Sequence, residues 1–346
     1  MTDPTPNRPL VTFALFAYNQ EQHIREAVEG AFSQTYEPLE IILSDDFSSD
    51  RTFEIMQEMA AAYEGPHEVR VRRSEINFGT ALHLSCVAAS MNGELLIVAA
   101  GDDISKPIRT ETIVTEWIKK GISSVSALHS ALELKYDNGE THDVPLKQGV
   151  KVKTDLGWFL QKDYNPMLGP TCAYNRHIFE EQGPLLGGSL IEDTPLMLRA
   201  MISGELVAVD EPLITQRYVT ESAGRNHHIS NAKRWNRFVH SRMTARVNAL
   251  LDIADNQNMA KSIKYSLEKK LIQENKKLSS LLVKSTFSRN SVTKAFLVIK
   301  FFFQNPRRRG VITGMADSLK FVYGGEKTFL SPKTVSQIRK LLRSKR

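Results

Sequence analysis

Two pairs of adjacent aspartates in this sequence each follow a run of apolar residues. Residues 40–46 read EIILSDD, and residues 95–103 read LLIVAAGDD. Paired carboxylate oxygens at the end of a strand are ligands that suit Mg²⁺ or Mn²⁺. A solvated turn is the alternative, because Asp side chains accept hydrogen bonds from nearby backbone groups in turns. The choice between the two interpretations depends on the elements that position these side chains.

A third acidic pair, Glu192-Asp193, precedes a stretch with helical spacing that runs from Thr194 to Ser203. Two carboxylates at the start of a helix are stabilised by the helix dipole. A carboxylate held in a cleft is also suited to remove a proton from a hydroxyl group during catalysis. Both interpretations can hold for the same two residues.

The first 120 residues alternate strand patterns with helical patterns. We expect strands at 11–17, 40–44, 69–72 and 94–100, and helices at 21–32, 53–63, 80–91 and 108–120. Further strands are expected at 125–136, 171–174, 206–209 and 213–218. This alternation predicts an α/β fold with a mostly parallel sheet and helices on both faces. Ligands bind beyond the carboxyl ends of such strands, so the first two aspartate pairs are expected to face one cleft.

Charge divides the chain into two parts. Residues 231–346 contain 26 Lys and Arg against 6 Asp and Glu. The whole chain contains 45 Lys and Arg against 39 Asp and Glu, so most of the acidic residues precede residue 231. An acidic body therefore precedes a basic tail, in which we expect helices at 233–254 and 260–282 and no strand. We place the domain boundary there, with an α/β domain at 1–230 and a basic helical region at 231–346.

The cysteine count and the N-terminus bear on the compartment. Cys86 and Cys172 can form at most one disulfide, which excludes a disulfide scaffold and favours reduced thiols in a cytoplasmic protein. The first ten residues lack the basic and apolar regions of a signal peptide. The longest strongly apolar run, residues 295–303, has about half the length that a membrane-spanning helix needs. The sequence therefore predicts a cytoplasmic protein with no transmembrane segment.

Basic and aromatic residues concentrate at 294–309, which read KAFLVIKFFFQNPRRR. This composition suits a helix that lies on an anionic membrane, with its rings at the headgroup boundary and its cations over the phosphates. The alternatives are a helix packed on the body and a nucleic-acid patch. No recognisable nucleic-acid module accompanies the patch, so we expect no nucleic-acid partner. We expect a peripheral protein on the inner face of the plasma membrane.

Three stretches taken together resemble the family 2 glycosyltransferases, which have the GT-A (Rossmann-like) fold. They read FAYNQEQHIREAVEGAFSQTYEPLEIILSDDFSSDRT, NFGTALHLSCVAASMNGELLIVAAGDD and IEDTPLMLRA, and the resemblance covers about residues 9–220. It implies an inverting enzyme that moves a sugar from a nucleotide-diphosphate donor, a UDP-sugar before others, with Mn²⁺ or Mg²⁺ at the diphosphate. With the basic tail, it implies a lipid-linked or growing saccharide as acceptor, in the synthesis of a bacterial cell-surface polysaccharide.

The resemblance assigns six residues to the nucleotide: Phe16, Ala17, Tyr18, Asp46, Asn77 and Gly79. The first three line the base pocket in the family, and the last two lie where the family approaches the ribose and the diphosphate. Asp46 is implied to accept a hydrogen bond from the ring N–H of the base, because an ionised carboxylate is an acceptor. Uracil, thymine and guanine all present such an N–H, so this contact alone leaves the nucleotide open.

The resemblance assigns metal binding and proton transfer to the other two acidic pairs. It implies that Asp103 is a direct metal ligand and that Asp102 reaches the ribose or a metal-bound water. Ala100 stands where many members of the family have another Asp. Asp193 matches the catalytic base, which takes the proton of the acceptor hydroxyl opposite the departing nucleotide, and Glu192 supports it or touches the acceptor.

The first loop disfavours two other enzyme classes. A nucleotidyltransferase and a dinucleotide oxidoreductase would each need a Gly-rich phosphate loop near the N-terminus, and residues 13–20 contain no glycine. A catalytically inactive protein of the same fold, which binds a sugar nucleotide or acts as a scaffold in a polysaccharide assembly complex, stays open as the alternative.

Overall fold

The computed structural model describes residues 8–146, 167–185 and 192–218, and then 245, 248–250, 252, 253, 256, 259–271 and 273. All of them except residue 273 belong to one unit of the chain, which comprises Met1–His228 and His240–Leu271. The aromatic and basic segment 294–309 lies outside the described residues. The domain boundary near residue 230 and a membrane-binding role for the basic region therefore stay predictions.

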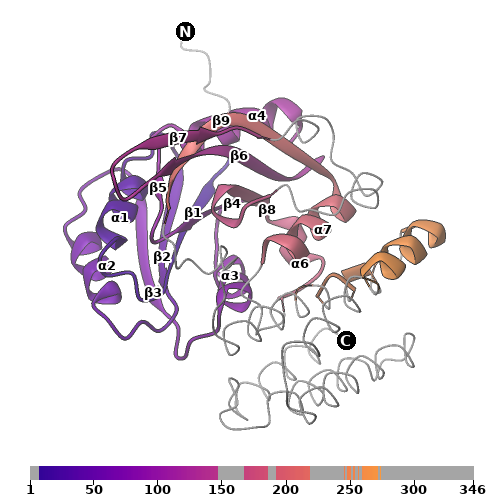
Figure 1. Ribbon diagram of the computed structural model, residues 1–346, viewed down its shortest axis with the longest axis horizontal. Helices are drawn as coiled ribbons and strands as arrows, with labels where there is room; N and C mark the ends of the chain where they lie inside the picture. Colours follow the sequence, from indigo (N-terminus) through magenta and orange to yellow (C-terminus); the bar gives the residue numbers. More distant parts are fainter. Residues whose placement is uncertain are drawn as a thin grey trace. The chain divides into compact units, whose positions relative to one another are not determined.

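Within the described residues, nine strands form one mixed, curled sheet in the order β3-β2-β1-β4-β8-β6-β9-β5, with β7 paired to β6 (Figure 1). Their bounds are β1 (Val11–Ala17), β2 (Leu39–Asp45), β3 (Glu68–Arg73), β4 (Leu95–Ala100), β5 (Ile104–Ser105), β6 (Val125–Lys135), β7 (Thr141–Val144), β8 (Cys172–Asn175) and β9 (Glu205–Arg217). The first four strands pair in parallel, as the alternation of strands and helices predicts. β8 pairs antiparallel with both β4 and β6, and β5 and β7 add further antiparallel pairs, while β6 and β9 run parallel.

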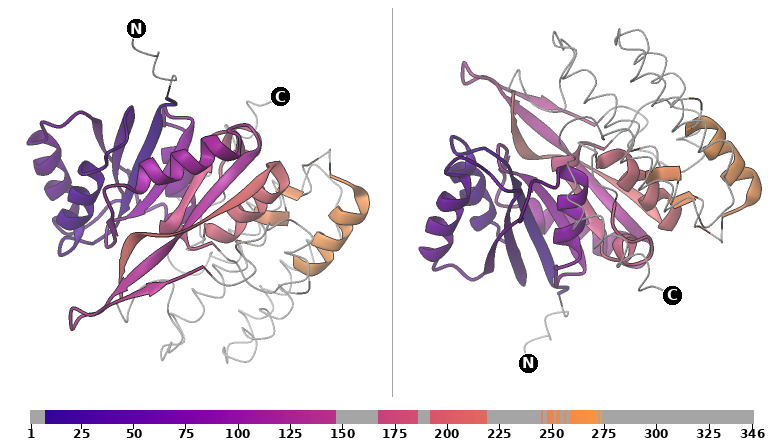
Figure 2. Two further views of the ribbon diagram at one scale, coloured as in Figure 1. Left: turned by 90° about the horizontal axis from the view of Figure 1, so that it is seen from above. Right: turned by 90° about the horizontal axis from the view of Figure 1, so that it is seen from below.

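Helices cover both faces of the sheet, which confirms the predicted layers (Figure 2). Their bounds are α1 (Ile24–Phe32), α2 (Thr52–Ala61), α3 (Thr80–Ala88), α4 (Arg109–Lys120), α6 (His177–Glu180) and α7 (Asp193–Ser203), with a short 3-10 helix η1 (Gly169–Thr171). Buried side chains of α1, α2 and α4 join one core, and those of α3, α6 and α7 join the other. Residues 261–271 are also helical and contribute Leu267 and Leu271 to the second core.

The continuous apolar runs of β1 and β2 follow from this double coverage. Phe13 and Leu15 of β1 enter the core that contains α1 and α4, whereas Ala14 between them enters the core that contains α3. A strand buried on both faces has apolar side chains at most positions, so it lacks the polar alternation of a half-exposed strand. The sequence therefore identifies these central strands without difficulty.

Three strands differ from the expectations drawn from the sequence, and the short helices η1 and α6 were not predicted. β9 is one strand where two were predicted, because Pro212 lies opposite Ala131 at an irregularity in the β6–β9 register. A proline cannot donate to a regular ladder, so it is tolerated at such a place. β5 and β7 were not predicted, since one is two residues long and the other is exposed throughout. In the described part of the chain, no helix is both long enough and apolar enough to cross a membrane.

Candidate functional site

The carboxyl ends of β1, β2 and β4 lie side by side and carry the first two aspartate pairs. Phe16 of β1 pairs with Ser44 of β2 on one side and with β4 on the other. Beyond the strands, the Asp46 backbone N–H donates to the Ala17 carbonyl oxygen over 2.9 Å, and the Gly101 N–H donates to the Phe16 carbonyl oxygen over 2.8 Å. The two pairs therefore flank the end of β1 at one edge of the sheet.

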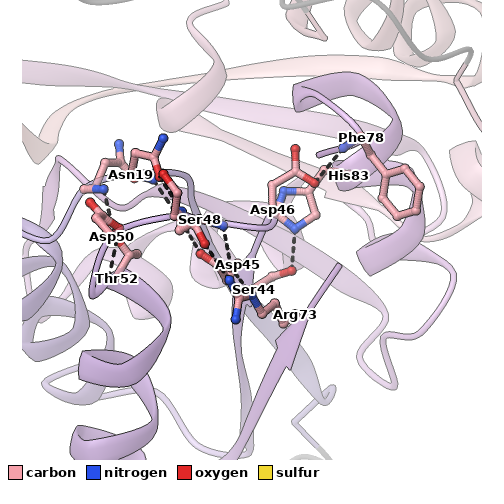
Figure 3. Close-up of polar contacts among 12 residues, drawn as sticks. Asn19, Ser44, Asp45, Asp46, Ser48, Asp50, Thr52, Arg73, Phe78 and His83 are labelled. Atoms are coloured by element: carbon pink, nitrogen blue, oxygen red, sulfur yellow. Dashed lines mark hydrogen bonds and ion pairs between the residues drawn. The ribbon is translucent and has the colours of Figure 1, made fainter. Parts of the chain in front are cut away.

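Asp45 is fully buried and holds the loop that follows β2 (Figure 3). Its carboxylate accepts hydrogen bonds from the Ser48 hydroxyl and, over 2.9 Å, from the Ser48 backbone N–H. The Nε atom of Arg73 lies 3.2 Å from Asp45 Oδ2, and the same guanidinium lies over the rings of Phe47 and Phe53. Asp45 thus stabilises a turn, which is the alternative that the sequence left open for this pair.

Side-chain to backbone hydrogen bonds tie the loop after β1 to the loop after β2. Asn19, whose φ of 53° is uncommon for a residue other than glycine, accepts a bond from the Ser49 N–H over 2.8 Å. Asp50 accepts bonds from the Glu21 N–H at 3.1 Å and from the Thr52 N–H at 3.0 Å. These contacts fix the loop that follows the aspartate pair against the loop after β1 (Figure 3).

Asp46 faces the loop that precedes α3 (Figure 3). Its Oδ1 atom accepts a hydrogen bond from the Phe78 N–H over 2.9 Å, and its Oδ2 atom accepts one from the Gly79 N–H over 2.8 Å. Gly79 has a φ of 74°, which a residue without a Cβ adopts at little cost. Burial raises the pKa of Asp46, although the two N–H groups oppose that shift. The structure therefore places Gly79 beside Asp46, and Asn77 lies in the same loop, one residue before Phe78.

Three residues predicted for the base pocket differ in exposure: Phe16, Ala17 and Tyr18. The Phe16 ring packs edge-on against the His83 ring with the centroids 5.2 Å apart, the Ala17 side chain is buried, and the Tyr18 side chain is 49% exposed. The Ser44 hydroxyl bonds to His83 Nε2 and accepts a bond from Arg72 over 2.9 Å. Burial, and then the charge of Arg72, lowers the pKa of His83 to about 3, so this ring is neutral.

Asp103 is buried in the turn between β4 and β5, and Asp102 beside it is partly exposed. The Oδ1 atom of Asp103 accepts a hydrogen bond from the Arg217 N–H at the end of β9, over 3.3 Å. Burial, and next the charge of Asp102, raises the pKa of Asp103 to about 7. The turn is pressed against the loop after β1, because a Cβ on Gly101 would lie 2.5 Å from Gln20 Oε1.

Glu192 and Asp193 lie where α7 begins, as the sequence predicts. Glu192 is buried, and its Oε1 atom lies so close to Gly169 that a Cβ on that glycine would clash with it. Burial, and then the charge of Asp193, raises the pKa of Glu192 to about 8. Asp193 is partly exposed and accepts a bond from the Thr194 hydroxyl over 3.3 Å. Glu192 is therefore protonated at neutral pH, while its neighbour is more accessible to solvent.

Arg109, the first residue of α4, connects the turn after β4 to the neighbourhood of Glu192. Its buried guanidinium donates to the Val98 and Pro170 carbonyl oxygens, over 2.7 Å in each case, and to the Ser105 hydroxyl over 2.9 Å. The sequence patterns did not identify this residue. An arginine in an amphipathic pattern is expected on the solvent face of its helix, so no sequence signal could have singled it out.

Residues 12–183, which include β1 to β8, match the profile of glycosyl transferase family 2. The chain belongs to glycosyltransferase family 2. An uncharacterized glycosyltransferase of Haemophilus influenzae is 28% identical to it over 186 residues, which are 51% of this chain and 54% of that protein. The chain thus spans about half the length of this curated relative.

Two solved structures share the fold of this family 2 glycosyltransferase. S. aureus TarS 1–349 in complex with UDP-GlcNAc superposes with a TM-score of 0.56 and 15% identity, over 90% of this chain and 81% of that one. Mannosyltransferase PcManGT from Pyrobaculum calidifontis, in complex with GDP-Man and Mn²⁺, superposes with a TM-score of 0.50 and 14% identity. The match covers 92% of this chain and 86% of that one. At these identities the likeness concerns the fold, and it confirms the predicted GT-A class.

The divalent cation that the sequence resemblance implies would need oxygen ligands at this site. Within the described ranges, no group of three or more His, Cys, Asp or Glu side chains gathers as a ligand cluster. Asp102 and Asp103 do provide two adjacent carboxyl groups, and Mg²⁺ is commonly held by one or two carboxylates together with substrate phosphates. The raised pKa of Asp103 marks a buried charge that a cation would offset. The residues therefore fit a cation shared with a diphosphate.

The predicted site residues form three groups at this edge of the glycosyltransferase sheet. Asp46 lies with Asn77 and Gly79, and Asp102 lies with Asp103 across the end of β1. The third group, at the start of α7, is connected to β4 through η1 and Arg109. Asp45 alone among the acidic pairs is committed to holding a loop.

Proposed function

We propose that this chain is an inverting glycosyltransferase that moves a sugar from a UDP-sugar to a hydroxyl group of a lipid-linked or growing saccharide. The observation that carries the proposal is the set of three acidic groups around the ends of β1, β2 and β4. A fold shared with proteins in complex with UDP-GlcNAc and GDP-Man supports a nucleotide sugar as donor. The setting we propose is the synthesis of a bacterial cell-surface polysaccharide.

The nucleotide base is proposed to bind beside Asp46. Each oxygen of this carboxylate accepts one backbone N–H and keeps a second lone pair, so a ring N–H of uracil can still be accepted. The rings of Phe16 and Tyr18 supply apolar surface next to it, on backbone that continues through Ala17. The loop that carries Asn77 and Gly79 then lies toward the ribose and the diphosphate.

Mn²⁺ or Mg²⁺ is proposed to be held by Asp103, with Asp102 as a second ligand or as a contact to the ribose. When bound, such a cation offsets the negative charge that develops on the leaving diphosphate. The Arg217 N–H donates to Asp103 and so limits the orientations that this carboxyl group can take. Gly101 keeps the turn close to the end of β1, where the donor would lie.

Asp193 is proposed to take the proton of the acceptor hydroxyl as the new bond forms. Attack on the face opposite the leaving diphosphate inverts the anomeric carbon. Glu192 is protonated at neutral pH, because burial raises its pKa to about 8, so it can donate a hydrogen bond to the acceptor or to Asp193. The two adjacent carboxyl groups thus take different roles because their environments differ.

Binding and turnover of the donor test this function. UDP, GDP and dTDP, each with and without Mn²⁺, are compared by thermal shift, because ligand binding raises the apparent stability by mass action. Release of nucleoside diphosphate from the matching sugar nucleotides is then measured for the wild type, for Asp193→Asn, and for Glu64→Gln as an exposed control far from the sheet edge. We expect a shift with UDP and Mn²⁺, and turnover that Asp193→Asn alone abolishes. Binding without turnover would favour an inactive sugar-nucleotide-binding protein. The absence of both binding and turnover would favour a scaffold.

The basic region 231–346 is proposed to hold the protein on the inner face of the plasma membrane, where a lipid-linked acceptor is accessible. The support is its composition, 26 Lys and Arg against 6 Asp and Glu. We expect the full chain to sediment with phosphatidylglycerol vesicles but not with phosphatidylcholine vesicles, and to be released by salt. Failure to sediment with the anionic vesicles at low salt would contradict the proposal.

A further inference from the structure

Arg109 is a buried cation that is bound by neutral oxygens. Its Nη2 atom donates to the Val98 and Pro170 carbonyl oxygens, and its Nη1 atom donates to the Ser105 hydroxyl. The guanidinium carbon also lies 5.7 Å from the centre of the Phe13 ring. A buried charge is tolerated when hydrogen bonds replace its lost hydration, and these three bonds serve that purpose. They also determine which backbone segments are held together.

The two carbonyl groups belong to segments that carry different parts of the site. Val98 lies in β4, shortly before the turn with Asp102 and Asp103. Pro170 lies in η1, next to the glycine whose missing Cβ makes room for the Glu192 carboxyl group. A single nitrogen of Arg109 therefore joins the proposed donor side of the site to the proposed acceptor side.

We propose that Arg109 is a positioning residue, which keeps η1 and the Glu192 carboxyl group beside it at a fixed distance from the end of β4. The inference rests on the proposed function and adds a residue to it. The end of β4 is already held by its parallel pairing with β1 up to Ala100. η1 lies outside the regular ladder, because β8 pairs with β4 only through Leu95, Leu96 and Ile97. Loss of the guanidinium would therefore release η1 rather than β4.

Lysine cannot replace this arrangement. The planar guanidinium holds the donors of two nitrogens in a fixed fork, whereas a lysine ammonium carries its three N–H donors on one nitrogen at the end of a flexible chain. Arg109 stays charged at neutral pH, although burial lowers its pKa to about 9. The substitution Arg109→Lys keeps the charge and removes the fork, so it separates positioning from electrostatics.

The chain offers a matched control at the other end of β4. Arg176 also binds backbone carbonyl groups, donating from Nε to Gly93 over 2.9 Å and from Nη2 to Met91 over 2.7 Å. These oxygens lie in the turn before β4, at the amino end of the strand and away from the three acidic groups. Arg176→Lys therefore removes the same kind of contact without touching η1.

The test compares Arg109→Lys with Arg176→Lys in the full chain. For Arg109→Lys we expect a kcat for UDP-sugar turnover about tenfold or more below the wild type, with the Kd for UDP in Mn²⁺ changed less than about twofold. We also expect faster hydrogen–deuterium exchange in peptides that cover residues 168–173. For Arg176→Lys we expect neither the kcat loss nor the faster exchange at 168–173.

Several outcomes would overturn the inference. An unchanged kcat in Arg109→Lys, a parallel loss of UDP affinity, or an equal kcat loss in Arg176→Lys would each do so. If Arg109→Lys does not fold, Arg109→Gln replaces the guanidinium with a neutral amide of shorter reach, and an unchanged kcat with unchanged exchange at 168–173 would also reject the role. A wild type without turnover on any sugar nucleotide would instead contradict the proposed function.

Discussion

Asp45-Asp46 and Asp102-Asp103 lie at the carboxyl ends of two parallel strands as the same dipeptide, yet the protein contacts the two pairs differently. Asp45 is bonded to Ser48 and Arg73, and both oxygens of Asp46 accept backbone N–H groups. Asp103 is buried as deeply, but burial and the neighbouring Asp102 raise its pKa to about 7. The first pair therefore receives an ion pair and short hydrogen bonds from the protein, whereas a bound cation would offset the charge of Asp103.

The difference arises from the residues that come after each strand. The loop after β2 has serines, and β3 beside it contributes Arg73. The turn after β4 is three residues long and leads directly into β5, so Asp103 is contacted from β9, where the Arg217 N–H donates to it over 3.3 Å. An acidic pair at a strand end can thus be part of a loop or part of a ligand site, and the next few residues decide which.

The largest expected effect follows from removing charge in the second pair. Asp103→Asn should lower sugar transfer by about 100-fold or more, because the cation that offsets the diphosphate charge loses its direct ligand. Stability should not fall, since the substitution removes a buried charge. Turnover assays with Mn²⁺ and thermal unfolding without metal measure the two effects. A variant that is unstable but fully active when folded would show that Asp103 is structural, like Asp45.

The next effect concerns the first pair. Asp45→Ala should lower the free energy of unfolding by about 2 kcal/mol, because it leaves the Ser48 N–H without an acceptor and breaks the ion pair with the half-exposed Arg73. Urea unfolding followed by circular dichroism measures this change. The exposed Glu64→Gln control should remain within about 0.5 kcal/mol of the wild type. Equal midpoints for the two variants would contradict the loop-holding role.

A smaller effect is expected in the pH dependence of stability. The pKa of Glu192 is near 4.5 in the unfolded chain and about 8 in the folded one, so the folded state binds more protons between these values. Protonated Glu192 therefore makes its full contribution to the stability of the protein below pH 4.5. This contribution falls as the pH rises toward 8, by about 1 kcal/mol per pH unit. Histidines in the unfolded chain are protonated mainly below about pH 6.5. The decline caused by Glu192 is therefore measured above that pH.

Glu192→Gln should flatten this decline. Its Tm should exceed that of the wild type at pH 8 by more than at pH 6.5, although the variant should be a poorer enzyme. Thermal unfolding at the two pH values, without metal, measures the difference. A constant difference between the two proteins would mean that Glu192 titrates near its ordinary pKa.

The sequence predicts the parallel half of the sheet well and the other half less completely. β1, β2 and β4 are covered on both faces, so their apolar runs are continuous, and α1 and α4 show a clear helical period. β5 and β7 carry no such signal, because pairing with β9 and β6 defines them rather than their own side chains. The break predicted within β9 came from Asp210, Glu211 and Pro212, which the irregular register accommodates.

For the site, the sequence identifies residue types but not their partners. The three acidic pairs were found because each follows a strand pattern or opens a helix pattern. The division between Asp45 and Asp46 could not be predicted, since it depends on Arg73 and on the loop at Phe78, both distant in the chain. Arg109 could not be found either, because only the folded chain brings Val98 and Pro170 to its guanidinium.

The two arginines at the ends of β4 have a consequence for how this sequence can vary. Arg109 and Arg176 bind main-chain oxygens, which every amino acid supplies equally. Substitutions at Val98 or Met91 therefore leave these bonds available, as long as the backbone keeps its path. Gly93 is more constrained, because a Cβ there would lie 2.4 Å from the Thr12 backbone nitrogen. The strand can change its side chains over evolutionary time, while each arginine has no substitute of the same geometry.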